Sequence, residues 1–242
     1  MDDTSFQYTS EQSAEDAFDA LASYVVTDHS LEGALQLVVD LAAASIPGAQ
    51  MVGISLLRHG GVTTAVSSGA RVETIDLLQY RSGSGPCLQA IADAVPQLVR
   101  SMLTETRWPE FTNNALYEGV QSILAFPLRS ADEVFGALNL YSHQDDAFND
   151  RAVDLGEVFA SRASVVLLNA ARFEEATRLA EQLQEALQSR AVIDQAKGVL
   201  MEREKIGADE AFERLKALSQ RSNLKVRELA RRLVEDATGL SA

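Results

Sequence analysis

Hydrophobic and polar residues follow two different periods along the chain, and the change of period separates helical regions from strand regions. Up to residue 45, apolar positions recur every three or four residues, which is typical of amphipathic helices. Ser30 is placed to cap the second of these helices, and the Ile-Pro-Gly sequence at 46–48 ends it. Four apolar runs joined in pairs by short connections then favour two β-hairpins. The predicted strands of this antiparallel sheet are 51–58, 62–68, 122–130 and 133–142.

From about residue 149 the helical period resumes, and it continues to Glu204 without a proline. A periodic stretch of this length is typical of a coiled coil. Within it, apolar residues are spaced alternately by three and four positions, as in a heptad seam. The remaining residues of 174–190 are polar, and a lone helix in water is marginally stable, so we expect a parallel dimer rather than packing on the helix's own domain. The predicted dimerisation seam is Phe173, Ala176, Ala180, Leu183 and Leu187.

The last part of this helix and two shorter helices that follow it carry one apolar stripe each. The shorter helices are expected at about 209–220 and 226–234, with Ser222 or Asn223 capping the second. Three stripes separated by short turns predict a three-helix bundle. Gly198 lies inside the first helix of this bundle, where glycine costs about 1 kcal/mol relative to alanine. We expect its missing side chain to let another helix or an RNA backbone come close.

Charge is distributed unevenly along the chain. The formal net charge is −14, yet residues 190–236 hold 11 Lys and Arg against 9 Asp and Glu. Such an asymmetry indicates a nucleic-acid or membrane partner for the basic part, although a solvated helical face gives the same pattern. The amide and basic side chains of these helices are able to contact phosphates and unpaired bases, and we expect no exposed aromatic platform beside them.

Several classes of protein lack support in the sequence. No apolar run is long enough to span a membrane, and the N-terminus does not resemble a secretory signal, so we expect a cytoplasmic protein. The single cysteine, Cys87, excludes an intramolecular disulfide and a thiolate zinc cluster, and we expect no metal site. The glycine-rich sequence at 83–86 lacks the lysine of a P-loop, and no catalytic motif stands out, so we do not expect an enzyme.

Four residues of the N-terminal region have both a functional and a structural interpretation. Cys87 lies near the start of a predicted helix, which can lower a thiol pKa as in a redox sensor. A small buried hydrophobe is the favoured interpretation, because no second cysteine can resolve an oxidised thiol. Trp108 either lines a pocket or packs a loop onto the sheet. Asn139 and Tyr141 alternate with leucines on one strand, so they either line a ligand cavity or face water.

The C-terminal sequence resembles the ANTAR domain, a three-helix RNA-binding module of bacterial antitermination regulators. The resemblance is carried by SRAVIDQAKGVLMERE and ADEAFERLKALSQRSNLKVRELARRLVE. It implies that the protein binds paired RNA hairpins with hexanucleotide loops in a nascent transcript, so that RNA polymerase, affected indirectly, reads into the downstream genes. The residues expected to contact RNA are Arg190, Gln195, Lys197, Gly198, Arg203, Ser219, Gln220, Asn223, Lys225, Arg227 and Arg231.

The region before it resembles a GAF domain, a small-molecule-sensing fold related to PAS. SGSGPCLQA and the strands around FPLRS and VFGALNLYS carry this resemblance. It implies a small-molecule ligand, which by family analogy is a cyclic nucleotide or another metabolite. Some GAF relatives are methionine sulfoxide reductases that rely on several cysteines, so one cysteine disfavours that activity. The candidate ligand contacts are Cys87, Trp108, Phe126, Asn139 and Tyr141.

Together these observations predict an α+β protein, a dimeric antiterminator regulated by its sensor domain. Two other hypotheses remain: an enzyme built on the GAF fold whose C-terminal helices only dimerise, and an adaptor whose basic helix faces a partner protein. The expected segments are a disordered N-terminus at 1–12, a GAF domain with a PAS-like antiparallel sheet and flanking helices at 13–168, a coiled-coil linker helix at 169–189, and a three-helix ANTAR domain at 190–236.

Overall fold

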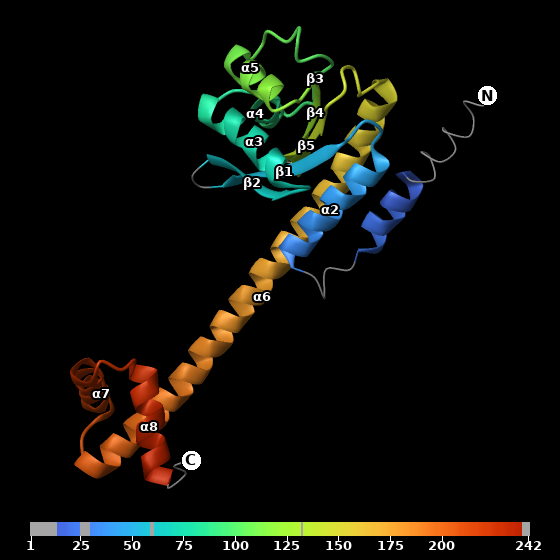
Figure 1. The fold of residues 1–242 in the computed structure, drawn as a ribbon. Coiled ribbons are helices and arrows are strands. Elements are labelled where there is room, and N and C mark those ends of the chain that lie inside the picture. Colours follow the sequence, from blue (N-terminus) through green and yellow to red (C-terminus); the bar gives the residue numbers. More distant parts are fainter. Residues whose placement is uncertain (1–13, 25–29, 59–60, 132, 239–242) are drawn as a thin grey trace. The chain divides into compact units, whose positions relative to one another are not determined.

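A computed structural model describes the chain over residues 14–24, 30–58, 61–131 and 133–238. The segment 1–12, expected to be disordered, lies outside these residues. The chain forms two compact units, which divide between Glu174 and Glu175 (Figure 1). Each unit has an apolar core of its own.

An antiparallel five-stranded sheet forms the centre of the N-terminal unit, as the sequence pattern predicts. Its strands lie in the order β2-β1-β5-β4-β3. The two predicted hairpins pair β1 with β2 and β4 with β5, while β1 and β5 pair in the middle of the sheet. The strands are β1 (Met51–Arg58), β2 (Gly61–Ser67), β3 (Gln97–Val99), β4 (Ser122–Arg129) and β5 (Val134–Ser142).

Helices cover both faces of this sheet (Figure 1). One face packs against α2 and the first part of α6, and Leu124 belongs to the core on that side. The other face packs against α3, α4 and α5, and Ile123 belongs to the core there. Neighbouring residues of one strand therefore enter different cores. The helices are α2 (Leu31–Ser45), α3 (Ala70–Ser82), α4 (Pro86–Asp93), α5 (Pro109–Tyr117) and α6 (Asp150–Glu204); residues 14–23 are also helical.

Local signals in the sequence lie where these elements begin and end. The Ser30 hydroxyl oxygen accepts a hydrogen bond from the Gly33 N–H at 3.2 Å, which caps α2 as predicted. Pro86 is the first residue of α4, a position where its missing N–H leaves no hydrogen bond unmade. Glycine is required at Gly136 on β5, because a Cβ there would lie 2.2 Å from the backbone oxygen of Ser55 on β1.

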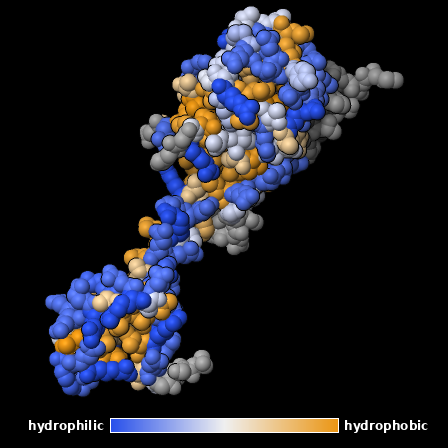
Figure 2. All heavy atoms as spheres, turned by 60° about the vertical axis from the view of Figure 1, so that its left-hand side comes forward, coloured by the Kyte–Doolittle hydropathy of each residue, from blue (hydrophilic) through white to orange (hydrophobic). Residues whose placement is uncertain are grey.

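The C-terminal unit is the predicted three-helix bundle. It consists of the last part of α6 together with α7 (Ala208–Ser222) and α8 (Val226–Thr238). Figure 2 shows hydrophilic residues around the hydrophobic residues of this unit on the visible face. Its core has small residues at several helix contacts, which lets the three helices approach closely. The buried core residues are Ala196, Leu200, Ala211, Leu215 and Ala230.

The connection between α7 and α8 differs from its prediction. Asn223 ends α7 in the left-handed conformation, with φ of 53°, so the expectation that Ser222 or Asn223 caps the start of α8 was wrong. Lys225 takes that position, and its carbonyl oxygen accepts a hydrogen bond from the Leu229 N–H at 3.1 Å. Asparagine is found at both ends of helices. Its side-chain oxygen can accept a hydrogen bond from the first N–H groups, and its backbone tolerates the positive φ that ends many helices.

Two features are absent from the described residues. None of their helices is both long and apolar enough to cross a membrane. The same residues contain no group of three or more His, Cys, Asp or Glu side chains placed to hold a metal ion.

Candidate functional site

The turn between α7 and α8 presents polar side chains to solvent. Gln220 in the last turn of α7, Asn223 after it and Lys225 before α8 are all exposed. Two amides and one ammonium group therefore lie within six residues, and such groups hydrogen-bond to phosphates and to the edges of unpaired bases. The predicted RNA contacts that are exposed are Arg190, Gln195, Gly198, Arg203, Gln220, Asn223, Lys225 and Arg231.

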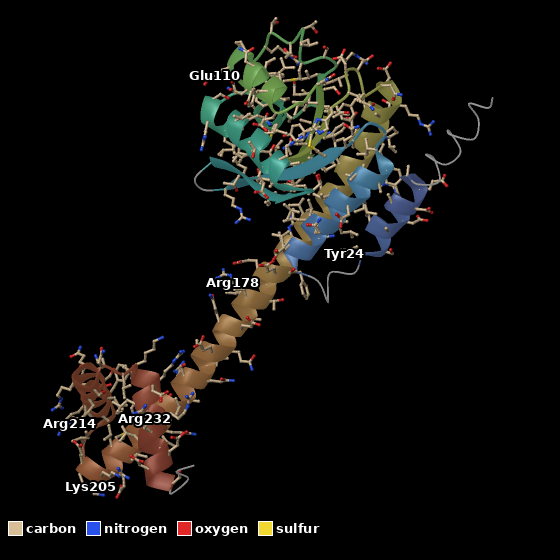
Figure 3. All side chains as sticks on the ribbon, viewed as in Figure 1. Tyr24, Glu110, Arg178, Lys205, Arg214 and Arg232 are labelled. Atoms are coloured by element: carbon tan, nitrogen blue, oxygen red, sulfur yellow. The ribbon has the colours of Figure 1, made fainter. Side chains whose placement is uncertain are left out.

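Several basic side chains of this unit form ion pairs that are exposed or partly exposed. Arg231 and Arg232 both contact Glu228, at 3.4 and 3.3 Å (Figure 3 labels Arg232). The ammonium group of Lys197 lies 3.3 Å from the Asp194 carboxylate. Exposed pairs of this kind contribute roughly 0–1 kcal/mol, so a phosphate group can replace the carboxylate at little cost.

Two of the predicted RNA contacts are engaged within the bundle. Arg227 on α8 forms an ion pair with Glu185 on α6. Ser219 is only 9% exposed, and its hydroxyl donates a hydrogen bond to the Leu224 carbonyl across the turn. This hydroxyl holds the turn closed and does not reach the surface beside Gln220. The predicted contact of Ser219 with RNA therefore lacks geometric support.

Gly198 lies on the side of α6 that faces away from the bundle core. Ala196 and Leu200, two positions before and after it, are buried in that core. A Cβ added at Gly198 would meet no atom of the described chain within 4 Å, its own helix backbone aside. The explanation by tight packing against another helix of the same chain is therefore wrong, and the open side of Gly198 faces solvent.

The predicted dimerisation seam is a row of uncovered apolar side chains along α6. Phe173 is 42% exposed, Leu183 61% and Leu187 60%. The small seam residues Ala176 and Ala180 are exposed as well, as is every residue from 172 to 188. A long helix with an apolar row of this kind fits a coiled coil.

A network of buried polar side chains lies between the sheet and helix α3 of the N-terminal unit. Its centre is Asp76 on α3, which is fully buried. The carboxylate accepts hydrogen bonds from the Tyr141 hydroxyl, from the Thr64 hydroxyl at 2.8 Å and from the Asn139 amide at 3.3 Å. A buried charge is tolerated only when it is hydrogen-bonded in this way.

Ser55 on β1 links this network to α4. Its hydroxyl oxygen accepts hydrogen bonds from the Asn139 amide at 2.8 Å and from the Cys87 thiol at 3.3 Å. Gln79 makes a second link, since its amide donates to the Tyr141 hydroxyl at 3.2 Å and its oxygen accepts from the Cys87 N–H at 2.8 Å. Together with Thr64 on β2, residues from three strands and two helices are thereby connected.

One acceptor of the network has no partner. The Asn139 Oδ1 atom is buried and receives no hydrogen bond from the described residues. An unsatisfied buried acceptor costs about 1–3 kcal/mol, so a donor that reached it from a bound molecule would gain that amount. The position of Asn139 in the centre of the sheet makes it a candidate ligand contact.

Burial controls the proton affinities in this network. It raises the pKa of Asp76 from 3.8 to about 6, although hydrogen bonds from Tyr141, Thr64 and Asn139 act to lower it. Burial, and secondarily the charge of Asp76, raises the pKa of the Cys87 thiol from 9.0 to about 12. The lowering expected at a helix start does not prevail. The structure therefore contradicts the redox-sensor interpretation of Cys87 and supports the buried hydrophobe.

The five predicted ligand contacts do not form a single site. Cys87, Asn139 and Tyr141 belong to the buried network, and Trp108 packs in the same apolar cluster as Tyr141. Phe126 pairs with the residue next to Asn139, so its ring enters the opposite core beneath α6. There it borders a separate cavity of about 390 Å³. The two groups of candidates mark two places on opposite faces of the sheet.

Sequence reasoning missed five members of the network. Three of them lie on α3 at spacings of three and four, so a polar stripe on a helix that also has apolar residues was the signal that could have identified them. The other two hydroxyls lie on strands, where serine and threonine give no such signal. The missed residues are Ser55, Thr64, Asp76, Gln79 and Tyr80.

Comparison with known structures supports the fold of the N-terminal unit. The chain is similar to the GAF domain of a phosphoenolpyruvate-protein phosphotransferase from Acinetobacter, with 17% identity and a TM-score of 0.51 over 71% of this chain and 97% of that one. It is also similar to a free methionine-R-sulfoxide reductase from Neisseria meningitidis, solved with its substrate, with 14% identity and a TM-score of 0.51 over 67% and 90%. At these identities the likeness shows the fold alone.

Comparison with protein families covers both units. A GAF domain matches residues 28–168, and an ANTAR domain matches residues 181–234. None of the curated proteins matches the sequence. A sensor domain joined to an ANTAR domain is, at the family level, the architecture of a ligand-sensing antitermination regulator rather than of an enzyme. The chain belongs to the GAF–ANTAR family.

Proposed function

We propose that the protein binds paired RNA hairpins in nascent transcripts through its C-terminal unit and thereby favours transcription past a terminator. The observation that carries the proposal is the exposed turn of Gln220, Asn223 and Lys225 inside the ANTAR domain. RNA polymerase is affected indirectly, because the bound RNA is held in an antiterminator structure. The excess of basic residues in 190–236 supplies the electrostatic part of the affinity.

A homodimer completes this proposal. Two copies joined along residues 169–189 would present two ANTAR domains, one for each hairpin of a pair. The exposed apolar row that contains Leu183 and Leu187 supports this arrangement, because water-exposed leucines at heptad spacing gain burial when two helices pair. Leu183→Asp should shift the protein toward monomer in sedimentation, while Gln182→Asp at the neighbouring exposed position should not.

The signal is proposed to enter through the GAF domain as a small polar molecule. The buried network of Asp76, Asn139 and Tyr141 supports this, since it contains one unsatisfied acceptor among several donors. A cyclic nucleotide is one candidate of this chemistry. Native mass spectrometry of the intact protein would reveal a co-purified molecule, and Asn139→Leu should lose it. If a molecule is retained equally by that variant, its site lies elsewhere.

Titration of the full chain with RNA tests the central proposal. We expect an RNA of two adjacent hairpins with hexanucleotide loops to bind more tightly than an unstructured RNA of equal length. The logarithm of the binding constant should fall linearly with the logarithm of the salt concentration. Lys225→Ala should reduce that slope by about 0.9 if its ammonium group contacts one phosphate.

Arg178→Ala is the matched control for charge. Arg178 is exposed on α6 and pairs with Glu175, outside the segment that we assign to RNA (Figure 3). Its removal changes the net charge by the same amount as Lys225→Ala and should leave the salt slope unchanged. Equal binding of paired-hairpin and unstructured RNA by the wild-type protein would refute the proposed function.

A further inference from the structure

Phe212 is the only aromatic residue between positions 175 and 242. Its side chain is 37% exposed, on α7 near the start of that helix. The expectation that the basic helices lack an exposed aromatic side chain was therefore wrong. In sequence, Phe212 forms an apolar stripe with Leu215 and Leu218, which favours a core position for the ring. In the structure, Ala211 and Leu215 occupy the core and are fully buried.

Three residues spaced by four positions form a line along α7, namely Phe212, Lys216 and Gln220. Residues four apart are neighbours on a helix surface. The Lys216 ammonium group lies 5.0 Å from the centroid of the Phe212 ring, a cation–π arrangement, and it also pairs with Glu213 at 2.5 Å. Gln220 is exposed at the far end of the line. An aromatic face, a cation and an amide are therefore aligned along one side of the helix.

This combination matches the chemistry of single-stranded RNA recognition. Unpaired bases of RNA loops stack on aromatic side chains, and their edges and phosphates form hydrogen bonds with amide and basic groups. A residue that only sealed the edge of the core would need apolar volume and not a ring. The line ends at Gln220, in the turn that carries Asn223 and Lys225. It therefore continues the surface already assigned to RNA toward the other end of α7.

We propose that Phe212 is a stacking platform for an unpaired base of the hairpin loop, with Lys216 contacting an adjoining phosphate and Gln220 a base edge. This inference rests on the proposed RNA-binding function. It adds a base contact to a surface that otherwise offers charges and amides. Lys216 must leave its position over the ring when the base arrives, and a phosphate replaces the carboxylate of Glu213 as its partner.

The test compares Phe212→Leu with Phe212→Tyr in the full chain, using an RNA of two hairpins that carries 2-aminopurine at successive loop positions. Loss of one stacked base reduces affinity by about tenfold or more, so Phe212→Leu should bind that much more weakly while Phe212→Tyr binds like the wild type. The salt slope should stay unchanged in both, because a ring releases no counterions. Fluorescence of 2-aminopurine at one loop position should be quenched by the wild type and by Phe212→Tyr only.

Lys216→Ala and Arg214→Ala separate local contact from general charge. Arg214 lies on the same helix but two positions from both Phe212 and Lys216, which places it on another face, where it forms an ion pair with Glu204 at 3.3 Å (Figure 3). Only Lys216→Ala should lower the salt slope, by about 0.7, the value for one phosphate of a single strand. If the wild type fails to prefer hairpin RNA, the proposed function itself is wrong. If it prefers hairpin RNA but quenches no loop position, or if Phe212→Leu binds as tightly as wild type, the stacking role is wrong and the proposed function stands.

Discussion

Helix α6 contains two glycines whose surroundings are opposite. A Cβ at Gly156, in the N-terminal unit, would lie 2.3 Å from the Phe126 ring. A Cβ at Gly198, in the C-terminal unit, would meet nothing within 4 Å apart from its own helix backbone. The same residue type in one regular helix is thus required by internal packing in the first case and by no internal contact in the second.

The contrast between these glycines extends to the polar chemistry of the two units. In the N-terminal unit the groups suited to recognition, such as Asp76 and Asn139, are fully buried. In the C-terminal unit Gln220 and Lys225 face solvent. On the proposed function, a small molecule has to enter the first unit and displace or satisfy internal contacts, whereas RNA has only to reach the surface of the second.

The largest expected difference between interior and surface concerns thiol reactivity. A pKa raised from 9.0 to about 12 lowers the thiolate fraction of Cys87 about a thousandfold near neutral pH. Labelling by a thiol reagent should therefore be slower than for a free thiol by at least that factor, and it should become fast after unfolding. The control is a Cys87→Ser, Ser222→Cys double variant, in which the thiol lies on the exposed end of α7. Comparable labelling rates in the two proteins would show that the Cys87 thiol is no less reactive than a thiol at the surface.

The pH dependence of stability gives the next largest effect. The pKa of Asp76 is raised on folding, so the folded state binds the proton more tightly and is most stable, relative to an Asp76→Asn variant, at low pH. As pH rises from about 4 to about 6, the wild type should lose about 3 kcal/mol relative to that variant. Urea unfolding followed by fluorescence measures this, because the single tryptophan, Trp108, is buried in the same unit. If the difference in the free energy of unfolding between the two proteins does not change with pH, the Asp76 carboxylate is in contact with water.

Substitution of Gly156 should destabilise the N-terminal unit. The added methyl group must displace the ring of Phe126, which is itself fully buried, and overpacking of this kind costs about 1–3 kcal/mol. We expect Gly156→Ala to lower the urea midpoint of Trp108 fluorescence despite the better helix propensity of alanine. A raised midpoint would mean that the core beneath α6 adapts freely.

Substitution of Gly198 should have the smallest effect and the opposite sign. Alanine gains about 1 kcal/mol of helix propensity, and its methyl group meets no obstacle. Gly198→Ala should therefore raise thermal stability measured by far-ultraviolet circular dichroism. The RNA affinity of this variant tests the remaining expectation, that an RNA backbone comes close to Gly198: weaker binding would show that RNA approaches this face of α6, and unchanged binding would show that it does not.

The fold was largely predictable because its signals are local. Alternating runs located β1, β2, β4 and β5, and the uninterrupted helical period located α6 through to Glu204. Signals that depend on geometry were less informative. Asn223 was assigned to the wrong helix end, since asparagine caps both ends and only the backbone angle distinguishes them.

The candidate sites were less predictable than the fold, because they depend on which face a residue occupies. The sequence places Phe126 and Asn139 on adjacent strands without indicating which face of the sheet each side chain occupies. The pairing of β4 with β5 places them on opposite faces. Asp76 was missed because charged residues on helices are usually exposed, and only tertiary packing buries this one. Phe212 was assigned to the core by its apolar character, whereas the rotation of α7 leaves it partly in water.

The hydroxyl of Ser219 has a thermodynamic consequence for the surface around it. Its hydrogen bond to the Leu224 carbonyl, together with the bond from the Leu224 N–H to the Ser219 carbonyl at 3.2 Å, fixes the turn that carries Gln220, Asn223 and Lys225. On the proposed function, these groups are ordered before RNA arrives, so binding does not have to offset the entropy of ordering them. Ser219 would then act on RNA affinity through preorganisation, as a buried hydroxyl that never touches the ligand.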